Sequence, residues 1–185
     1  MSKFRHIIFL GFATILVCGL WLLVSTPVMA AAFRSADYGF SADFPSAPSV
    51  GSPTPSEKDD RGNTLSTSGS FLAASEGVYF ADVSVDKYNM SATLNVPRSL
   101  EDERDNFVQA IPGTVTSSRT GTFQGFPAMS FTFQAANGFP KGRGMIVMPQ
   151  RAIPVIYIVV MAYFNNSSAS TIEDLNKFID SFKIE

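Results

Sequence analysis

The sequence has one histidine, one cysteine and one tryptophan in 185 residues, and all three lie near its N-terminus. They are His6, Cys18 and Trp21. If this stretch is a targeting segment, the working domain contains none of the three. A domain without His and Cys cannot form a Ser-His-Asp triad, a cysteine nucleophile or a zinc site with His or Cys ligands. It must also fold without disulfides. Carboxylate chemistry, Ser/Lys chemistry, hard-cation binding or no chemistry at all are what remain.

The first 30 residues have the three parts of a secretory signal. A basic start with Lys3 and Arg5 is followed by an uncharged run from Ile7 to Val24, and small residues end the segment at Ala30. This pattern predicts a signal peptide over residues 1–30 with cleavage after Ala30. The uncharged run of 18 residues is also long enough to span a hydrocarbon core of about 30 Å. An uncleaved membrane anchor therefore stays open as the alternative.

The residues after this segment have the size of one domain, since about 100–200 residues per domain is usual. Removing Lys3 and Arg5 from the 14 basic residues leaves 12 basic against 16 acidic residues, a net charge of −4. That balance leaves no basic stripe to attract a phosphate backbone, which argues against a nucleic-acid partner. We therefore expect a single exported domain over residues 31–185, in the periplasm or outside the cell. The inner membrane would hold it only if residues 1–30 stay attached.

Alternating apolar and polar residues predict that strands form most of this domain. We expect a strand or hairpin over 33–44 and then a Pro-rich surface loop over 45–63. The further expected strands are 64–73, 78–88, 114–123, 126–135, 144–148 and 155–164. The last of these is continuously apolar from Val155 to Met161, which indicates burial on both faces and a central place in the sheet.

Two amphipathic segments predict helices. The first is expected to begin at Ser99 and to end before Pro112, and the second has Ser170 and Glu173 at capping-box spacing and runs to Phe182. Together with the strands they predict an α+β fold: a mostly antiparallel sheet of about six to seven strands with a helix on each face, an α/β/α sandwich.

The acidic and nucleophilic residues of the domain form no convincing catalytic set. Ser84 and Lys87 match the S-x-x-K spacing of Ser-acylating enzymes. They fall on an expected strand, however, where residues three apart point to opposite faces. Asp82 and Asp86 share one face of that strand and are candidates for a carboxylate-dependent hydrolase, for holding a cation or a partner, or for a solvated strand face. The acidic run 101–105 fits the first turns of a helix, where carboxylates stabilise the helix dipole. No residue is assigned to catalysis, a cofactor or a metal.

The only concentration of basic residues lies between positions 141 and 151. It contains Lys141, Arg143 and Arg151, with Gly142 and Gly144 between the first two and after the second. The run lacks the third glycine and the following helix of a dinucleotide-binding fingerprint, so the default interpretation is a hairpin rim. If the domain docks on an acidic partner, these three side chains are the first candidates for the contact.

The order of elements resembles that of a known group. An opening strand reads YGFSADFP at 38–45 and leads into a Pro-rich loop. Paired strands and a helix follow, then a GFPA turn at 125–128 into a long strand, and a final helix ends at Ser181 and Phe182. Over residues 33–185 this resembles the PsbP/Mog1/DcrB-like group of exported bacterial proteins. The resemblance implies an α/β/α sandwich about an antiparallel sheet and a non-enzymatic accessory role. It carries over no functional residues.

Three functions follow as expectations. The first is an exported, non-catalytic binding or assembly accessory protein of the cell envelope, which uses no cofactor and contacts an envelope protein or a surface ligand. The second is a carboxylate-dependent hydrolase, which would need two carboxyl groups about 5–9.5 Å apart in a cleft. The third is a membrane-anchored structural protein with an extracytoplasmic head.

Overall fold

The structure, a computed structural model, describes residues 31–58, 64–89 and 94–185. The predicted signal peptide over 1–30 lies outside these residues, as does part of the predicted loop. Within the described ranges there is no helix with the length and apolar character needed to cross a membrane.

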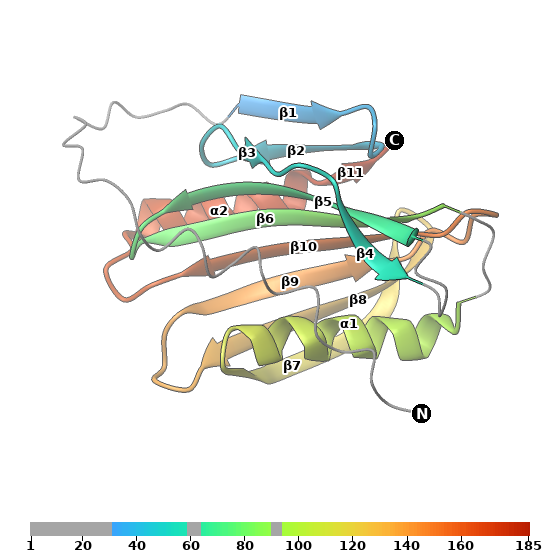
Figure 1. Cartoon of the computed structure of the whole chain (residues 1–185). Coiled ribbons are helices and arrows are strands. Elements are labelled where there is room, and N and C mark those ends of the chain that lie inside the picture. The colour runs from blue at the N-terminus through green and yellow to red at the C-terminus, as the bar shows by residue number, and fades with distance from the viewer. Residues whose placement is uncertain (1–30, 59–63, 90–93) are drawn as a thin grey trace.

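Most of the chain forms one antiparallel sheet of eight strands, ordered β3-β5-β6-β10-β9-β8-β7 with β4 paired to β5 (Figure 1). The strands are β3 (Ser49–Val50), β4 (Thr54–Lys58), β5 (Thr64–Ser75), β6 (Tyr79–Tyr88), β7 (Gly113–Phe123), β8 (Phe126–Ala135), β9 (Lys141–Val147) and β10 (Val155–Tyr163). The predicted central place of the continuously apolar segment is confirmed, because β10 lies between β6 and β9.

A second, smaller sheet is formed by β1 (Ala31–Ser35), β2 (Phe40–Phe44) and β11 (Lys183–Ile184). β1 and β2 pair antiparallel, so the second of the two forms expected for 33–44, a strand or a hairpin, is the one observed. Phe40 and Phe44 are fully buried and bring this sheet into the core. β11 joins the two ends of the domain by pairing with β2, a contact that the sequence did not indicate.

The two helices are α1 (Val96–Ala110) and α2 (Ala169–Ser181). α1 begins earlier than predicted, because the Asn95 side chain accepts a hydrogen bond from the Arg98 backbone N–H and Pro97 fits the first turn. α2 is capped by Ser168, whose hydroxyl accepts a hydrogen bond from the Thr171 backbone N–H. α1 therefore begins at Val96, before the expected Ser99, and α2 begins at Ala169, just before the expected Ser170.

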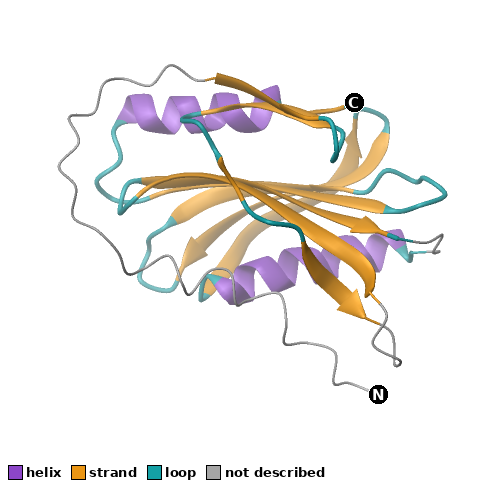
Figure 2. Cartoon of the chain, turned by 45° about the horizontal axis from the view of Figure 1, so that its top comes forward, coloured by secondary structure: helices purple, strands orange, loops and turns teal. Residues whose placement is uncertain are grey.

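The buried side chains form two clusters, and successive residues of β10 alternate between them. Tyr157 and Val159 belong to the cluster that contains α2 and β2, whereas Ile156 and Val160 belong to the cluster that contains α1. Figure 2 shows the two helices with the main sheet between them. We call the two surfaces of the main sheet the α2 side and the α1 side, after the helix that shares their cluster.

The antiparallel sheet and the two helices of the predicted α+β fold are confirmed, but the sheet has eight strands where six to seven were expected. The difference arises mainly from the Pro-rich stretch 45–63, predicted as loop, which contains β3 and β4. The strand expected from Gly144 begins earlier, at Lys141, so Lys141–Gly144 are the first residues of β9 after the β8–β9 turn. Proline is tolerated within a strand at the edge of a sheet, and among the described residues β4 pairs with β5 alone.

Two glycines of β9 face the α1 side and make room for aromatic rings from β8. Gly142 lies opposite Phe133, and Gly144 lies opposite Phe131. A Cβ atom at Gly144 would lie 2.4 Å from the Phe131 ring, and one at Gly142 would lie 2.1 Å from the Met161 carbonyl oxygen. The glycines of the basic run therefore serve packing, while the side chains of Lys141 and Arg143 point to the α2 side.

Candidate functional site

Each helix packs mainly on one part of the main sheet. α2 contacts β2, β10 and β6, whereas α1 contacts β7, β8 and β9. α2 therefore packs next to the α2 side of β7, β8 and β9 and does not cover it. Two adjoining cavities of about 540 Å³ and 330 Å³ lie there, and both are lined by Thr132 and Arg143. We call these two cavities together the groove.

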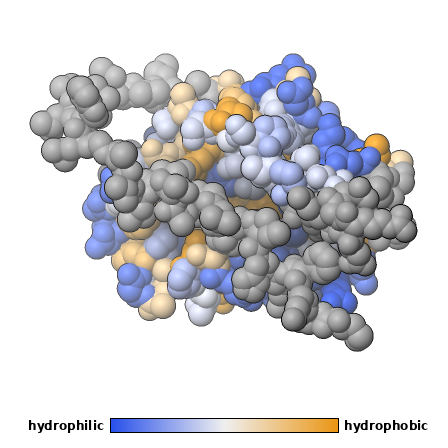
Figure 3. Space-filling view, in the orientation of Figure 1, coloured by the Kyte–Doolittle hydropathy of each residue, from blue (hydrophilic) through white to orange (hydrophobic). Residues whose placement is uncertain are grey.

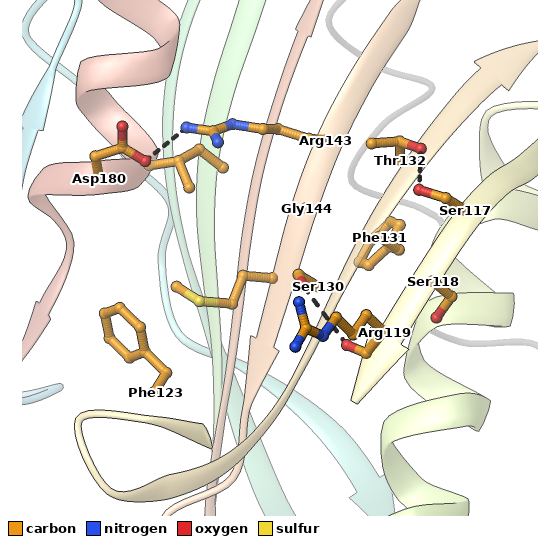
Figure 4. A pocket seen from close by; sticks show the side chains of 12 residues that line it. Ser117, Ser118, Arg119, Phe123, Ser130, Phe131, Thr132, Arg143, Gly144 and Asp180 are labelled. Carbon is orange, nitrogen blue, oxygen red and sulfur yellow. Dashed lines mark hydrogen bonds and ion pairs between the residues drawn. The ribbon is translucent and has the colours of Figure 1, made fainter. Parts of the chain in front are cut away.

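The groove has a hydroxyl-rich floor and an apolar wall. Its floor is made by β7 and β8, where the hydroxyls of Thr116 and Ser117 each lie 2.7 Å from that of Thr132. The wall includes Ile172 and Ile179 of α2. Figure 4 shows the α2 wall on one side and the β7–β8 floor on the other. This combination offers hydrogen bonds on one side of an occupant and apolar contact on the other.

Arg143 ties the floor of the groove to α2. Its guanidinium donates to Asp180 at 2.7 Å and to the Asn176 carbonyl oxygen at 3.0 Å, as Figure 4 shows for the first of these. The pair is partly exposed, with 34% of the Arg143 side chain and 70% of the Asp180 side chain accessible. Arg143 is therefore in part a structural residue, and its charge is already balanced.

Two further cations of the groove are not balanced in this way. Arg119 lies on β7 and Lys141 on β9, and Asp180 is the acidic residue among those that line the two cavities. The Lys141 ammonium lies 5.1 Å from the centre of the Phe139 ring, a cation–π contact. Within the described ranges, no carboxylate forms an ion pair with Arg119 or Lys141. The groove therefore carries unbalanced positive charge.

The structure separates the three predicted contact residues. Lys141 and Arg143 lie together at the start of β9 and line the groove. Arg151 follows the end of β9, where its guanidinium lies 3.5 Å from the Glu185 carbonyl oxygen. Hydrophilic residues gather around the C-terminus (Figure 3), and there Arg34 forms an ion pair with Glu185 at 2.5 Å. Arg151 thus belongs to a different surface.

The two aspartates that the sequence singled out lie on the α1 side, among serines of β5 and β6. Ser70 donates to Asp82 at 3.1 Å, Ser84 donates to the other oxygen of Asp82 at 2.6 Å, and Ser68 donates to Asp86. We call this set the Ser–Asp patch: Ser68, Ser70, Asp82, Ser84 and Asp86. Neither aspartate lines the groove.

Asp82 has an unusual protonation equilibrium. Its side chain is buried, with 6% of the residue exposed. Burial raises the pKa of Asp82 from 3.8 to about 6, and the hydrogen bonds from Ser84 and Ser70 oppose this shift. Its two oxygens are thus occupied by serine hydroxyls and not directed at an open cavity. In the part of the chain that the structure describes, Asp82 is the one buried carboxylate.

The other patterns weighed in the sequence have structural explanations. Ser84 donates its hydroxyl to Asp82, while Lys87 lies further along β6 and donates to the Asp37 carbonyl oxygen at 3.3 Å. The S-x-x-K spacing therefore brings no nucleophile and base together. In the acidic run, Asp102 pairs with Arg98 one turn earlier on α1, and Asp105 pairs with Arg104. Across the described ranges, no group of three or more His, Cys, Asp or Glu side chains could hold a metal ion.

Sequence reasoning missed Arg119. It is the single charged residue between Gly113 and Ala135, and that isolation in an otherwise uncharged hairpin is the signal that could have found it. The strand register shows where its side chain lies, because it places Arg119 opposite Ser130 on the α2 side of the sheet. Lys141 and Arg143 were named together because only Gly142 separates them in sequence.

Comparison with known proteins gives structural likeness and no sequence match. No family model matches the chain, and no curated protein matches it significantly in sequence. The solution structure of cyanobacterial PsbP (CyanoP) from Synechocystis sp. PCC 6803 has a TM-score of 0.53 at 9% identity, over 90% of this chain and 98% of that chain. The crystal structure of LpqN, involved in cell envelope biogenesis of Mycobacterium tuberculosis, has a TM-score of 0.51 at 10% identity, over 84% and 90%. The chain therefore has a PsbP-like fold, as the resemblance predicted.

Proposed function

We propose that this protein is an exported, non-catalytic accessory protein of the cell envelope that binds a partner through the groove. The observation that carries the proposal is the unbalanced charge of Arg119 and Lys141 beside an apolar wall and a hydroxyl-rich floor. A cation that contributes no ion pair to the fold is available for an anionic group of another molecule.

The setting in the envelope has two supports. The pattern of residues 1–30 is that of a secretory signal, and a protein of similar fold, LpqN, is involved in cell envelope biogenesis. If the signal is cleaved, the domain is free in the periplasm or outside the cell. If it is retained, the same domain is the head of a membrane-anchored protein. N-terminal sequencing of the exported protein distinguishes these forms, because a cleaved chain begins at Ala31, Ala32 or Phe33.

A carboxylate-dependent hydrolase has less support. That reaction needs one carboxyl group as acid and a second as base or nucleophile on either side of a bound substrate. Both oxygens of Asp82 accept hydrogen bonds from serines, and Asp86 accepts one from Ser68. No observation in the groove favours this chemistry.

The proposal is tested by photo-crosslinking in cells that produce the protein naturally. A photoreactive phenylalanine analogue is placed at Ser130, in the groove, and in a second strain at Gln109, an exposed position on α1. We expect a discrete crosslinked product of defined mass from position 130 and none from position 109. The product should disappear when Arg119→Glu is combined with the analogue at position 130.

Two results would contradict the proposal. Equal crosslinking from both positions would show contact that does not depend on the groove. Absence of any product at position 130, while the protein is folded and abundant in the envelope fraction, would show that the groove is not occupied.

A further inference from the structure

β7 is an edge strand with little of the usual protection against pairing with another chain. Among the described residues it pairs with β8 alone; it contains no proline, and every residue from Thr116 to Thr122 is exposed. Its one irregularity lies between Val115 and Ser117, so Ser117–Phe123 keeps a continuous register with β8. Natural edge strands are usually short, bulged, or rich in charge or proline.

The opposite edge of the same sheet shows that protection. β3 has two residues, and β4 has five, including Pro55. The register of β4 with β5 is broken on both sides of Glu57. One edge of the sheet is thus closed to pairing, while the other presents a long regular strand rich in β-branched threonine.

The backbone groups that β7 presents outward can be identified from its register. Thr122 lies opposite Pro127, which has no N–H, and the Pro127 carbonyl oxygen accepts from Met148 on the β9 side. Thr122 and Pro127 are therefore a pair without hydrogen bonds between them, and the N–H and C=O of Thr122 point away from β8. Since such pairs alternate with bonded ones, Thr120 and Ser118 also point their N–H and C=O groups outward.

The charge on this strand selects among possible occupants. Arg119 stands in the middle of the regular stretch, and its side chain lines the groove. Two copies of β7 paired antiparallel about Thr120 would bring the two Arg119 side chains to diagonal positions on one face, where like charges repel. A partner strand that carries a carboxylate where the second Arg119 would lie would instead form an ion pair with Arg119.

We propose that β7 accepts an extended segment of a partner protein as a further strand of the sheet, with an acidic side chain of that segment against Arg119. This inference rests on the proposed function, since it specifies how the partner of the groove is held. The backbone of the segment bonds to Ser118, Thr120 and Thr122, and alternate side chains of the segment reach into the groove.

The experiment uses two synthetic peptides of about nine residues, an ordinary strand length. Both alternate threonine and valine, and they differ in a central glutamate or a central lysine. We expect the glutamate peptide to protect the amides of Ser118, Thr120 and Thr122 from hydrogen exchange. The lysine peptide should bind about three- to tenfold more weakly. Arg119→Glu should reverse the order of the two peptides.

A matched pair of variants tests the strand pairing itself. Thr120→Pro removes an outward N–H and leaves the β7–β8 hydrogen bonds in place, whereas Thr120→Val keeps the N–H. We expect the first to abolish binding of the glutamate peptide and the second to preserve it. Circular dichroism and thermal melting of both variants check that the fold is intact.

Three outcomes overturn the inference. The first is a failure of both peptides to bind. The second is binding that shifts groove residues without protecting the three amides, or that survives Thr120→Pro. The third is a concentration-dependent dimer in which these amides are protected without peptide, because the occupant would then be a second copy. The crosslink from position 130 is a separate readout. If it survives Thr120→Pro and is lost with Arg119→Glu, the groove binds its partner without strand pairing.

Discussion

The groove and the Ser–Asp patch are both polar regions of one sheet, but they hold their charges differently. In the patch, Asp82 accepts hydrogen bonds from Ser70 and Ser84, so both of its oxygens are occupied. In the groove, Arg143 is paired with Asp180, whereas Arg119 has no ion-pair partner among the described residues. Asp82 is also buried and Arg119 is exposed.

The difference separates a structural polar cluster from a surface for contact. A buried polar group costs free energy unless it is hydrogen-bonded, and the serines of the patch meet that need within the chain. An exposed cation has no such need, so its position is free to serve another molecule. From the sequence the aspartates were candidate catalysts. In the structure, their carboxyl groups instead accept hydrogen bonds from serines of the same patch.

The largest effect on stability is expected at Gly142, the glycine that precedes Arg143 on β9 and allows close packing there. Gly142→Ala should lower the free energy of unfolding by about 3 kcal/mol, because the new Cβ would meet the Met161 carbonyl oxygen of the neighbouring strand. Gly121→Ala is the control, since a Cβ at Gly121 meets nothing within 4 Å. We expect that control to stay within about 0.5 kcal/mol of wild type in urea denaturation. Equal losses of stability for both variants would show that the close packing of Gly142 against Phe133 and Met161 does not stabilise this part of the sheet.

The next effect concerns Asp82, whose folded-state pKa of about 6 lies above the ordinary value of 3.8. Between these values the folded protein binds more protons than the unfolded chain, so the contribution of Asp82 to stability falls as pH rises through this window. Above pH 6 the cost amounts to up to about 3 kcal/mol. Asp82→Asn should therefore raise the free energy of unfolding at pH 7 by up to this amount.

The pH dependence distinguishes this cause from a simple change of packing. The advantage of Asp82→Asn over wild type should shrink toward zero near pH 4, where the wild-type carboxyl is protonated in the folded protein. Denaturant titrations of both proteins at pH 7 and pH 4 measure it. An advantage that is equal at both pH values, or a variant less stable than wild type at pH 7, would contradict the assignment.

A smaller effect is expected for the balanced pair of the groove. Arg143 and Asp180 are 2.7 Å apart and partly exposed, so solvent screens them and their coupling should be about 0.5 kcal/mol. A double-mutant cycle with Arg143→Met and Asp180→Asn measures that coupling, with Lys177 and Glu173 on α2 as an exposed reference pair. A coupling above about 2 kcal/mol would show that Arg143 serves mainly to hold α2 in place, as the serines of the patch serve Asp82, and that it is not a contact residue.

How far the sequence predicts this molecule depends on how local each signal is. The apolar run Val155–Met161 placed β10 at the centre of the sheet, since burial on both faces leaves a direct mark on composition. β4 was missed because Pro55 suggests a loop, and only the position at a sheet edge makes that proline acceptable.

The candidate site shows the same limit. Lys141 and Arg143 were proposed together from their closeness in sequence, and the structure keeps them together on β9. Arg151 was grouped with them on the same ground, but the structure places it near Glu185, on a different surface. Arg119 lies far from them in sequence and reaches the groove through the pairing of β7 with β8 and β8 with β9. No local pattern encodes that neighbourhood.

The smallest effect on stability, and the sharpest test of the contrast, is expected for Arg119→Ala. The side chain is exposed and forms no ion pair with a described residue, so its removal should change the free energy of unfolding by less than about 0.5 kcal/mol. The same substitution should abolish or strongly reduce the crosslink from position 130, which depends on charge in the groove. Urea denaturation and crosslinking of one preparation measure both quantities. A loss of stability above about 1 kcal/mol would mean that Arg119, like Asp82, serves the fold, and its role as a contact residue would fall.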